Sequence, residues 1–402
     1  MLKQNEKKEN LVKYKLLYTI IIILVYVLGK SLPLHMIDIS AYLHKTIDAE
    51  DLLLQTISGD IYQCSLFALG ISPYMISSML IQIISAFRKA ETRSKISPKQ
   101  TNKNVLTMAL VIAIIQSVIR VQQLVFRVSG PDLLWAKSIA VIEMVTGAMI
   151  IVWLSSRNKK YGIGGQSALI FINILDGIIS NLQGQAIQDL LIPIVISMVV
   201  MAVVIFMENT EVRIPVQRIS IHNIYADKNY LAIKLNPIGV MPAMFSTACF
   251  MIPTLILSLL AMVMPDDATL LWIQENMSLT KPLGISVYIV LIYVLSIGFS
   301  RVFINPKELT EQFLKSGDSL LNIHAGKDTR KYLSRTINCI SFASATVLSI
   351  CLCVPMILQT TGAMQSTLAS LPSSVLMLTG IWCNLYREVR AIGNLEAYKP
   401  FI

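Results

Sequence analysis

The feature that most constrains this chain is a series of ten apolar segments, each close to the roughly 20 residues that a helix needs to cross a ~30 Å hydrocarbon core. With 54% hydrophobic and only 14% charged residues among 402, the chain is too apolar for a soluble multidomain protein. We predict an all-α polytopic membrane protein with ten transmembrane helices. The segments lie near residues 15–33, 62–86, 105–126, 133–155, 165–183, 188–207, 239–263, 284–304, 336–357 and 371–387.

The lysines and arginines are unevenly distributed over this pattern. If the amino terminus is cytosolic and the segments alternate in direction, all but six of the 34 Lys and Arg residues lie on the cytosolic side. We therefore predict a plasma-membrane protein with both termini in the cytosol. The net charge of +10 then requires no nucleic-acid partner. The six exceptions are Lys30, Lys45, Arg120, Arg127, Lys137 and Lys281.

The interval between the fifth and sixth segments divides the chain into residues 1–186 and 187–402, with five segments in each part. An odd number of spans makes the second part enter the membrane from the opposite side, which an inverted repeat requires. We predict two inverted five-helix halves. The second half then carries the two large cytosolic loops, at about 208–238 and 305–335.

The segment Phe67–Ile83 differs from an ordinary lipid-facing span. It is apolar enough to enter a bilayer, yet it contains small and helix-bending residues such as Gly70, Pro73 and Ser77. Such residues at membrane depth indicate a helix that packs against protein or lines a cavity. A kinked packing helix and a cavity wall remain equally open from this segment alone.

Three connecting segments have patterns of their own. Residues 34–61 contain the apolar piece Leu52–Ile57, which is too short to cross a membrane and could form either an amphipathic loop helix or a short re-entrant helix. The loop at 208–238 alternates polar and apolar residues, which predicts a strand or hairpin. The loop at 305–335 predicts a helix from Pro306, ending at Ser316 and Gly317.

Catalytic and metal-binding patterns are missing from the sequence. It contains no His-Glu-x-x-His, Gly-x-Ser-x-Gly or Walker motif, its six cysteines form no Cys-x-x-Cys pair, and its four histidines are scattered. The glycine-rich stretch at 161–167 lacks the Gly-Lys-Ser/Thr of a phosphate loop and predicts the start of a helix. We expect no enzyme activity, no catalytic residue, no metal and no cofactor.

A few ionisable residues lie at or near membrane depth: Arg120, Lys137, Glu143 and Asp176. They could form packing pairs, or they could couple ion movement to transport. The second interpretation would make the protein an inverted-repeat secondary transporter for a small solute. It is the alternative to the function considered next.

Several stretches, taken in order, resemble one known family, the SecY/Sec61 protein-conducting channels. The resemblance covers nearly the whole chain. Each stretch alone is only modestly specific for the family, but the combination in this order is highly specific. The stretches are Phe67-Ala-Leu-Gly-Ile-Ser-Pro-Tyr-Met, Gly162-Ile-Gly-Gly, Arg213-Ile-Pro-Val-Gln, Lys234-Leu-Asn-Pro-Ile-Gly-Val-Met-Pro-Ala-Met-Phe, Asn305-Pro-Lys-Glu and Lys331-Tyr-Leu.

The resemblance implies an hourglass channel that opens sideways to lipid between spans two and three and spans seven and eight. It implies a plug helix at about 49–60, with the apolar residues Leu52, Leu53, Leu54 and Ile57. It also implies a ring of apolar side chains at the waist, where flexible methionines could seal around varied substrates. Alignment of the motifs assigns this ring to Ile71, Met75, Ile170, Ile174, Met244 and Met377.

The same resemblance implies partners. They are a cytosolic motor ATPase of the SecA type, small SecE/SecG-like membrane subunits, the exported polypeptide and the lipid bilayer. The motor would dock on the two large loops, and the candidate docking residues are Arg213, Arg218, Lys307, His324, Lys327 and Arg330.

Two departures narrow the resemblance within the family. The usual Gly-Ile-Arg-Pro-Gly before span nine is Asn322-Ile-His-Ala-Gly here, so that His324 replaces a permanent cation. The usual Gly-Asn-Gly at the fifth span is Gly164-Gly-Gln. These departures resemble the accessory Sec channel of Gram-positive bacteria, which implies a dedicated motor and serine-rich glycoprotein adhesins as cargo.

Overall fold

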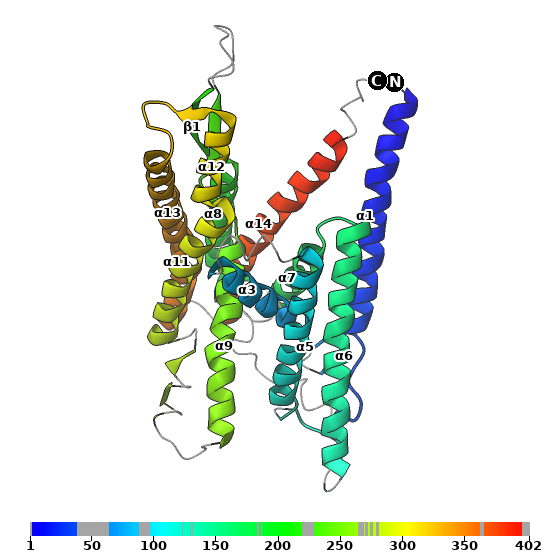
Figure 1. The fold of residues 1–402 in the computed structure, drawn as a ribbon. Helices are drawn as coiled ribbons and strands as arrows, with labels where there is room; N and C mark the ends of the chain where they lie inside the picture. Colours follow the sequence, from blue (N-terminus) through cyan, green and yellow to red (C-terminus); the bar gives the residue numbers. More distant parts are fainter. Residues whose placement is uncertain are drawn as a thin grey trace.

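The computed structural model describes residues 2–37, 64–87, 97–122, 124–128, 132–182, 187–218, 229–263, 281–361 and 366–395, with a few single positions between these ranges. It is mostly helical (Figure 1). The helices are α1 (Leu2–Lys30), α3 (Ser72–Phe87), α5 (Pro98–Gln122), α6 (Asp132–Tyr161), α7 (Gln166–Leu182), α8 (Ile187–Asn209), α9 (Met241–Val263), α11 (Pro282–Ile304), α12 (Pro306–Ser316), α13 (Lys327–Thr360) and α14 (Ser366–Leu395). The strands are β1 (Glu211–Arg218), β2 (Tyr230–Lys234) and β3 (Asp318–Leu320).

Every predicted span overlaps one of these helices. Within the described residues, seven segments are long and apolar enough to cross a membrane. The central helices α3 and α7 have 16 and 17 residues, or about 24–26 Å at 1.5 Å per residue, which is shorter than a full crossing. The helical membrane architecture is therefore confirmed, while ten complete spans stay a prediction. The seven segments are Val12–Lys30, Lys99–Gln122, Asp132–Tyr161, Asp189–Asn209, Pro282–Ser316, Lys327–Thr360 and Leu368–Gly393.

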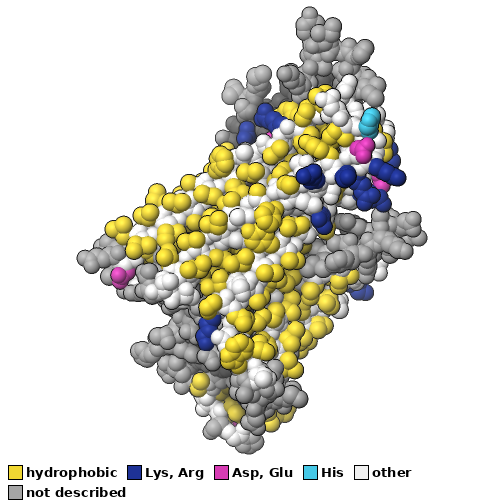
Figure 2. All heavy atoms as spheres, turned by 90° about the vertical axis from the view of Figure 1, so that its left-hand side faces the viewer, with side chains coloured by type: hydrophobic (Ala, Val, Ile, Leu, Met, Phe, Trp, Pro, Cys, Tyr) yellow, Lys and Arg dark blue, Asp and Glu magenta, His cyan; other side chains and the backbone are white. Residues whose placement is uncertain are grey.

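The helices form two groups with the short helices between them. In Figure 1, α1, α5 and α6 lie on one side, α9, α11 and α13 lie on the other, and α3 and α7 lie in the centre. The start of α1, the end of α14, α12 and the strands all lie at the same end of the molecule. Figure 2 shows a broad apolar surface whose lysines and arginines gather mainly near one end, as expected of a protein embedded in lipid.

The two loops predicted to be cytosolic combine into one small unit. β1 pairs with β2 in an antiparallel register that runs from Glu211 opposite Lys234, and its other edge pairs with β3, giving the order β2-β1-β3. Apolar residues of the sheet, such as Ile214, pack with Leu333 and Ile337 of α13 in a separate core. We call the sheet, α12, the loop at 321–326 and the first turns of α13 the sheet module.

The sheet module tests three predictions from the sequence. The hairpin predicted in the first loop is confirmed as β1 and β2. The helix predicted from Pro306 is confirmed, because α12 ends at Ser316 and Gly317 follows with φ +73°, a left-handed conformation that favours glycine. The three-residue strand β3 was not predicted, because its only sequence signal is too short to show a period of two.

The prediction of a span over 62–86 is wrong at its start. Residues 64–71 form turns, and helix α3 begins only at Ser72, where Pro73 suits a first helical turn. The irregular segment pairs with the chain that follows α1: Leu34 N–H donates to the Cys64 carbonyl at 2.7 Å, and Leu66 N–H donates to Leu32 at 2.9 Å. Such pairing lets non-helical backbone exist at membrane depth.

The predicted plug lies outside the described residues. Its apolar positions Leu52, Leu53, Leu54 and Ile57 fall within 38–63. The plug stays a prediction.

Helix α6 supports the irregular segment through a close backbone contact at Gly147. A Cβ atom placed there would overlap the carbonyl of Leu66. We therefore expect Gly147→Ala to lower the stability of the purified protein by roughly 1–3 kcal/mol, since backbone must move to admit the methyl group. Thermal unfolding in detergent measures the change.

Gly298→Ala on α11 is the matched control, because a Cβ there meets nothing within 4 Å. Its melting temperature should stay the same or rise slightly, as alanine favours a helix over glycine. Equal melting temperatures for the two variants would contradict the close contact at Gly147.

Candidate functional site

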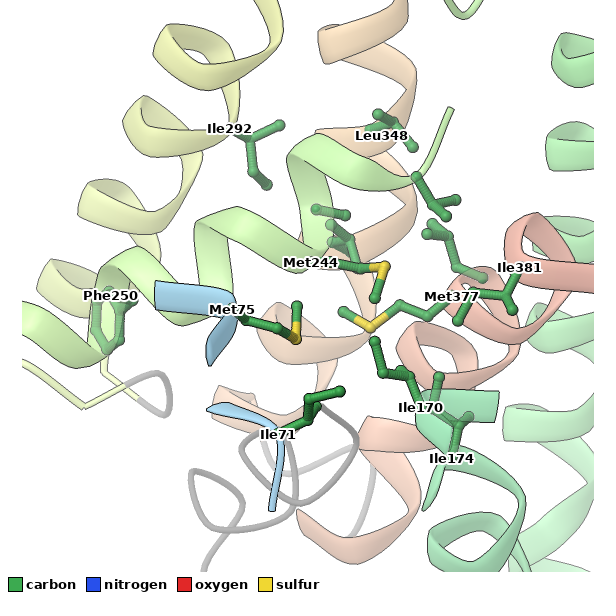
Figure 3. Packing of buried hydrophobic residues seen from close by; sticks show 14 of the residues in the cluster. Ile71, Met75, Ile170, Ile174, Met244, Phe250, Ile292, Leu348, Met377 and Ile381 are labelled. Carbon is green, nitrogen blue, oxygen red and sulfur yellow. The ribbon is translucent and has the colours of Figure 1, made fainter. Parts of the chain in front are cut away.

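Six residues predicted from the sequence come together at the centre of the molecule. All six belong to one buried hydrophobic cluster, and none is more than 8% exposed. They come from α3 and the residue before it, from α7, from α9 and from α14. We call this group the central cluster, and Figure 3 shows it. Its members are Ile71, Met75, Ile170, Ile174, Met244 and Met377.

Local geometry aligns these side chains. The N–H of Met75 donates to the carbonyl of Ile71 at 3.1 Å, so the two residues lie one helical turn apart. Ile170 and Ile174 have the same four-residue spacing on α7 and therefore share one face. In Figure 3, the side chains of Met75, Met244 and Met377 point toward one common region between the helices.

The structure also adds residues that the sequence analysis missed. Ile292 of α11, Leu348 of α13 and Ile381 of α14 belong to the same hydrophobic cluster and are nearly or completely buried. Ile381 follows Met377 by four residues, a spacing that could have identified it. Ile292 and Leu348 lie in uniformly apolar helices, so the sequence offered no comparable signal.

Buried hydrogen bonds hold the surrounding helices in place. The Tyr26 hydroxyl of α1 donates to the Asn173 side chain of α7 at 2.8 Å, next to Ile174. Tyr26 also stacks on Phe67, with ring centroids 5.7 Å apart. The Asn173 side-chain oxygen is thus bonded to α1 beside the cluster, and the six side chains themselves present only hydrocarbon and thioether groups.

A second apolar contact joins the predicted halves beside the central cluster. Met79 of α3 packs with Phe245 of α9 and with Leu295 and Phe299 of α11. The rings of Phe245 and Phe299 lie 5.3 Å apart. Helices α3 and α5 both contact α9. The helices between which the resemblance implies a lateral opening are therefore in apolar contact here.

A buried ion pair joins α8 to α14. Glu208 is 1% exposed at its side chain, and Arg387 donates to its carboxylate at 2.8 Å and also to its backbone carbonyl. Asn236 donates to the other carboxylate oxygen at 3.3 Å and accepts a hydrogen bond from Ser344 of α13 at 2.9 Å. A buried charge requires such partners, because an unpaired one would be expensive.

The next residue of α14 contacts the other half. Glu388 accepts a hydrogen bond from the backbone N–H of Gly164 at 3.0 Å. This amide belongs to the glycine-rich turn before α7, where Asn158 donates to the carbonyls of Ile163 and Gly165 at 2.9 Å each. The turn starts a helix, as predicted.

The candidate docking residues all lie in the sheet module. Arg213 and Arg218 are on β1, and the Arg213 guanidinium lies 4.7 Å from the centre of the Tyr230 ring. Lys307 is the second residue of α12 and pairs with Glu311 at 4.0 Å, with both side chains about half exposed. Lys327 and Arg330 are exposed in the first turn of α13, and His324 is exposed in the loop just before it. The module therefore gathers residues that are distant in sequence.

The carboxylates considered for ion coupling have separate structural partners. Asp176 of α7 forms an ion pair with Lys30 of α1 at 2.7 Å. Glu143 of α6 accepts a hydrogen bond from the backbone N–H of His35 at 3.0 Å. Over the part of the chain that the structure describes, no group of three His, Cys, Asp or Glu residues could hold a metal ion. This arrangement does not favour a shared ion-coupling site.

Comparison with known proteins agrees with this geometry. A family model described as SecY matches residues 65–386, a range that includes all six residues of the central cluster. The chain belongs to the SecY family. Its relatives include the accessory Sec system protein translocase subunits SecY2 of Leuconostoc gelidum subsp. gasicomitatum, 26% identical over 98% of each chain, and of Streptococcus agalactiae, 29% identical over 97% of this chain and 96% of the relative.

Solved structures share the fold of this SecY-family chain. One described as the structure of a protein conducting channel has a TM-score of 0.70 at 16% identity and covers 96% of this chain and 93% of its own. Another is described as showing that the plug domain of the SecY protein stabilises the closed state of the translocation channel. It has a TM-score of 0.66 at 17% identity and covers 96% of this chain and 93% of its own. At such low identity the likeness concerns the fold.

The Glu208–Arg387 pair gives a second testable prediction. Glu208→Ala should lower stability by about 3–5 kcal/mol, because it leaves a partly buried Arg387 without its carboxylate. The double variant Glu208→Met/Arg387→Met removes both charges and should recover much of this loss. Chemical or thermal unfolding of the purified protein measures both effects.

The exposed pair on α12 supplies the control. Glu311→Ala should change stability by no more than about 0.5 kcal/mol, as expected of a solvent-exposed i,i+4 pair. If Glu208→Ala costs no more than Glu311→Ala, the buried network does not hold α8 and α14 together.

Proposed function

We propose that this SecY-family protein is the pore subunit of a protein translocation channel of the accessory Sec system. On this proposal it exports polypeptides, with serine-rich glycoprotein adhesins as the cargo, across the plasma membrane. A dedicated SecA-type motor ATPase drives the movement, and small SecE/SecG-like subunits complete the complex. The chain itself is not an enzyme. The observation that carries the proposal is the meeting of six apolar residues from four helices at the central cluster.

The chemistry of the central cluster suits a seal. In an apolar constriction, ions lose their hydration shells and water molecules lose hydrogen bonds to other water molecules. A closed ring of hydrocarbon side chains therefore opposes the passage of both. Met75, Met244 and Met377 are unbranched and adaptable, and they can repack around chains of different shape. A passing polypeptide would replace contacts within the ring by contacts of a similar kind.

The apolar contact between α3 and α9 supports a lateral opening at this place. Its members, such as Met79 and Phe245, hold the two sides together without an ion pair or hydrogen bond between these side chains. Contacts of this type are individually weak and non-directional. They can separate when an apolar segment of the substrate takes their place, while the networks around Glu208 and Asn158 keep each side intact.

The sheet module is the proposed docking site for the motor. It projects from the helices and carries the six candidate residues. Its position at the same end as the start of α1 and the end of α14 supports a cytosolic orientation for all three. His324 stands where the resemblance implies arginine, and an imidazole lacks the planar five-donor fork of a guanidinium. Its partner surface would therefore differ from that of a motor that binds arginine.

Cross-linking tests the path of the substrate. In a background without the six native cysteines, Ile71→Cys or Ile174→Cys should cross-link to a single cysteine in a stalled exported chain, because both side chains face the proposed path. The control is Ile142→Cys on α6, whose side chain is 65% exposed on the outer surface. Equal cross-linking at all three positions would contradict the proposed pore.

Removal of the predicted plug tests the seal. Deleting residues 52–58 should leave a foldable protein that conducts ions in planar bilayers, because a plug blocks the pore without holding the helices together. Conductance by the unmodified channel and its thermal stability are the references. An unchanged conductance would show that these residues do not seal the pore.

A further inference from the structure

Helix α1 supplies none of the six residues of the central cluster, yet it presents one buried stripe to other helices. Intervals of three and four residues place the members of this stripe on one face of the helix. Other residues of α1, such as Leu24 and Leu28, are more than half exposed. The members of the stripe, each no more than 8% exposed, are Thr19, Ile22, Tyr26 and Lys30.

Two polar contacts join the stripe to the middle of α7. The Tyr26 hydroxyl donates to the side-chain oxygen of Asn173 at 2.8 Å. The Lys30 ammonium donates to the carboxylate of Asp176 at 2.7 Å. Tyr26 and Lys30 are one turn apart on α1, and Asn173 and Asp176 are about one turn apart on α7. The two contacts are therefore consecutive, and Ile174 of the central cluster lies between them in sequence.

A third contact of the stripe fixes the start of α7. The Thr19 hydroxyl accepts a hydrogen bond from the backbone N–H of Ile163 at 2.9 Å, in the glycine-rich turn that leads into α7. Helix α7 has 17 residues, and α1 bonds to the segment before it and to two of its later turns. Contacts at three levels fix both the depth of α7 and its rotation about its own axis.

The same face of α1 contacts the other element of the first half that reaches the central cluster. The Tyr26 ring stacks on Phe67, with the ring planes 15° apart. Gly29 leaves room for this arrangement, because a Cβ atom there would overlap the Phe67 ring. Phe67 lies four residues before Ile71, in the irregular segment that leads into α3. Tyr26 therefore contacts both segments through which the first half contributes to the cluster.

The placement of Ile170 and Ile174 depends on the rotation of α7. Successive residues of a helix are about 100° apart around its axis, and these two side chains share one face. A single rotation of α7 would therefore withdraw both of them from the central cluster. The bonds of Asn173 and Asp176 oppose such a rotation, since hydrogen bonds weaken steeply when donor and acceptor are misaligned.

Burial makes these two contacts difficult to replace. Asn173 is 2% exposed, and its side-chain nitrogen has no hydrogen-bond partner among the residues that the structure describes. The bond from Tyr26 therefore orients this amide. Lys30 is 8% exposed, and a buried ammonium is expensive without a carboxylate beside it. Loss of either contact would leave a desolvated polar group next to the central cluster.

We propose that Tyr26 and Lys30 are positioning residues for the central cluster. They act through α7, which they hold at the rotation at which Ile170 and Ile174 complete the apolar seal. The inference rests on the proposed function, because a closed seal matters only if the protein is a channel. Loss of either contact should leave a folded protein whose α7 is free to turn and whose seal is imperfect.

Cysteine labelling tests the placement of α7 without substrate or motor. In full-length protein without the six native cysteines, Ile174→Cys should react slowly with a water-soluble maleimide, because this position is completely buried. Adding Tyr26→Phe, which keeps the aromatic ring, should raise the labelling rate roughly tenfold, as expected from the loss of one hydrogen bond. Adding Lys30→Met should have an effect of similar size.

Tyr293→Phe is the matched control for Tyr26→Phe. It removes a hydroxyl that donates to Thr346 at 3.0 Å and so links α11 to α13, away from α7. It should leave the labelling of Ile174→Cys unchanged, whereas a general loss of stability would affect both tyrosine variants. Lys30→Asp should also accelerate labelling, and adding Asp176→Lys should restore much of the slow rate, because the ion pair forms again in the opposite direction.

Ion conductance in planar bilayers separates this inference from the proposed function. The Tyr26→Phe/Lys30→Met variant should conduct without substrate, and the protein lacking residues 52–58 is the reference for an open pore. Unchanged labelling in Tyr26→Phe and Lys30→Met, or an equal rise in Tyr293→Phe, would overturn the positioning role whatever the conductance. Faster labelling with conductance by the reference alone would overturn the link to the seal. Faster labelling with conductance by neither protein would overturn the proposed pore and leave the placement of α7 by α1 intact.

Discussion

The apolar contact among α3, α7, α9 and α14 is the interaction on which the rest of the structure depends. Its six members are separated by up to about three quarters of the chain. Two of the four helices that supply them, α3 and α7, are shorter than a full membrane crossing. The shortness of α3 and α7 leaves irregular backbone at the start of each helix. That backbone must be buried in protein, since lipid cannot satisfy its polar groups.

The polar networks show how such burial is achieved. Residues 64–71 bond to the chain after α1, and the turn before α7 bonds to Asn158 and Thr19. On the other side of the molecule, the Glu208 carboxylate accepts hydrogen bonds from Arg387 and Asn236. Helix α14 contacts both sides through consecutive residues, because Arg387 donates to α8 and Glu388 accepts from Gly164. Directional bonds thus hold each side and also join α14 to the turn before α7, while non-directional contacts fill the centre.

Hydrogen-bonded networks at the sides and apolar contacts in the centre are suited to a channel that must open and close. Apolar side chains can exchange one contact for another at little cost, and methionine does so most readily. Hydrogen-bonded networks in a low-dielectric interior are far less tolerant of change, because every broken bond leaves a desolvated group.

Much of this could be predicted from the sequence because its signals are local. Apolar segments of sufficient length determined where helices form, and Pro306 and Gly317 determined the ends of α12. The four-residue spacing of Ile71 and Met75, and of Ile170 and Ile174, determined which face each pair shares. The motif resemblance placed Met244 and Met377 with them, which periodicity alone could not do in helices that are apolar on every side.

Only the tertiary structure decided how these elements meet. The pairing of β1 with β3 joins two loops about 100 residues apart, and no local pattern specifies such a partner. The irregular segment before α3 packs closely on α6, where the Leu66 carbonyl approaches Gly147, and this contact joins different segments. Glu208 and Arg387 each resemble an ordinary residue at a helix end until the fold makes them neighbours. Sequence fixes local conformation, whereas burial and long-range pairing depend on contacts that exist only once the chain has folded.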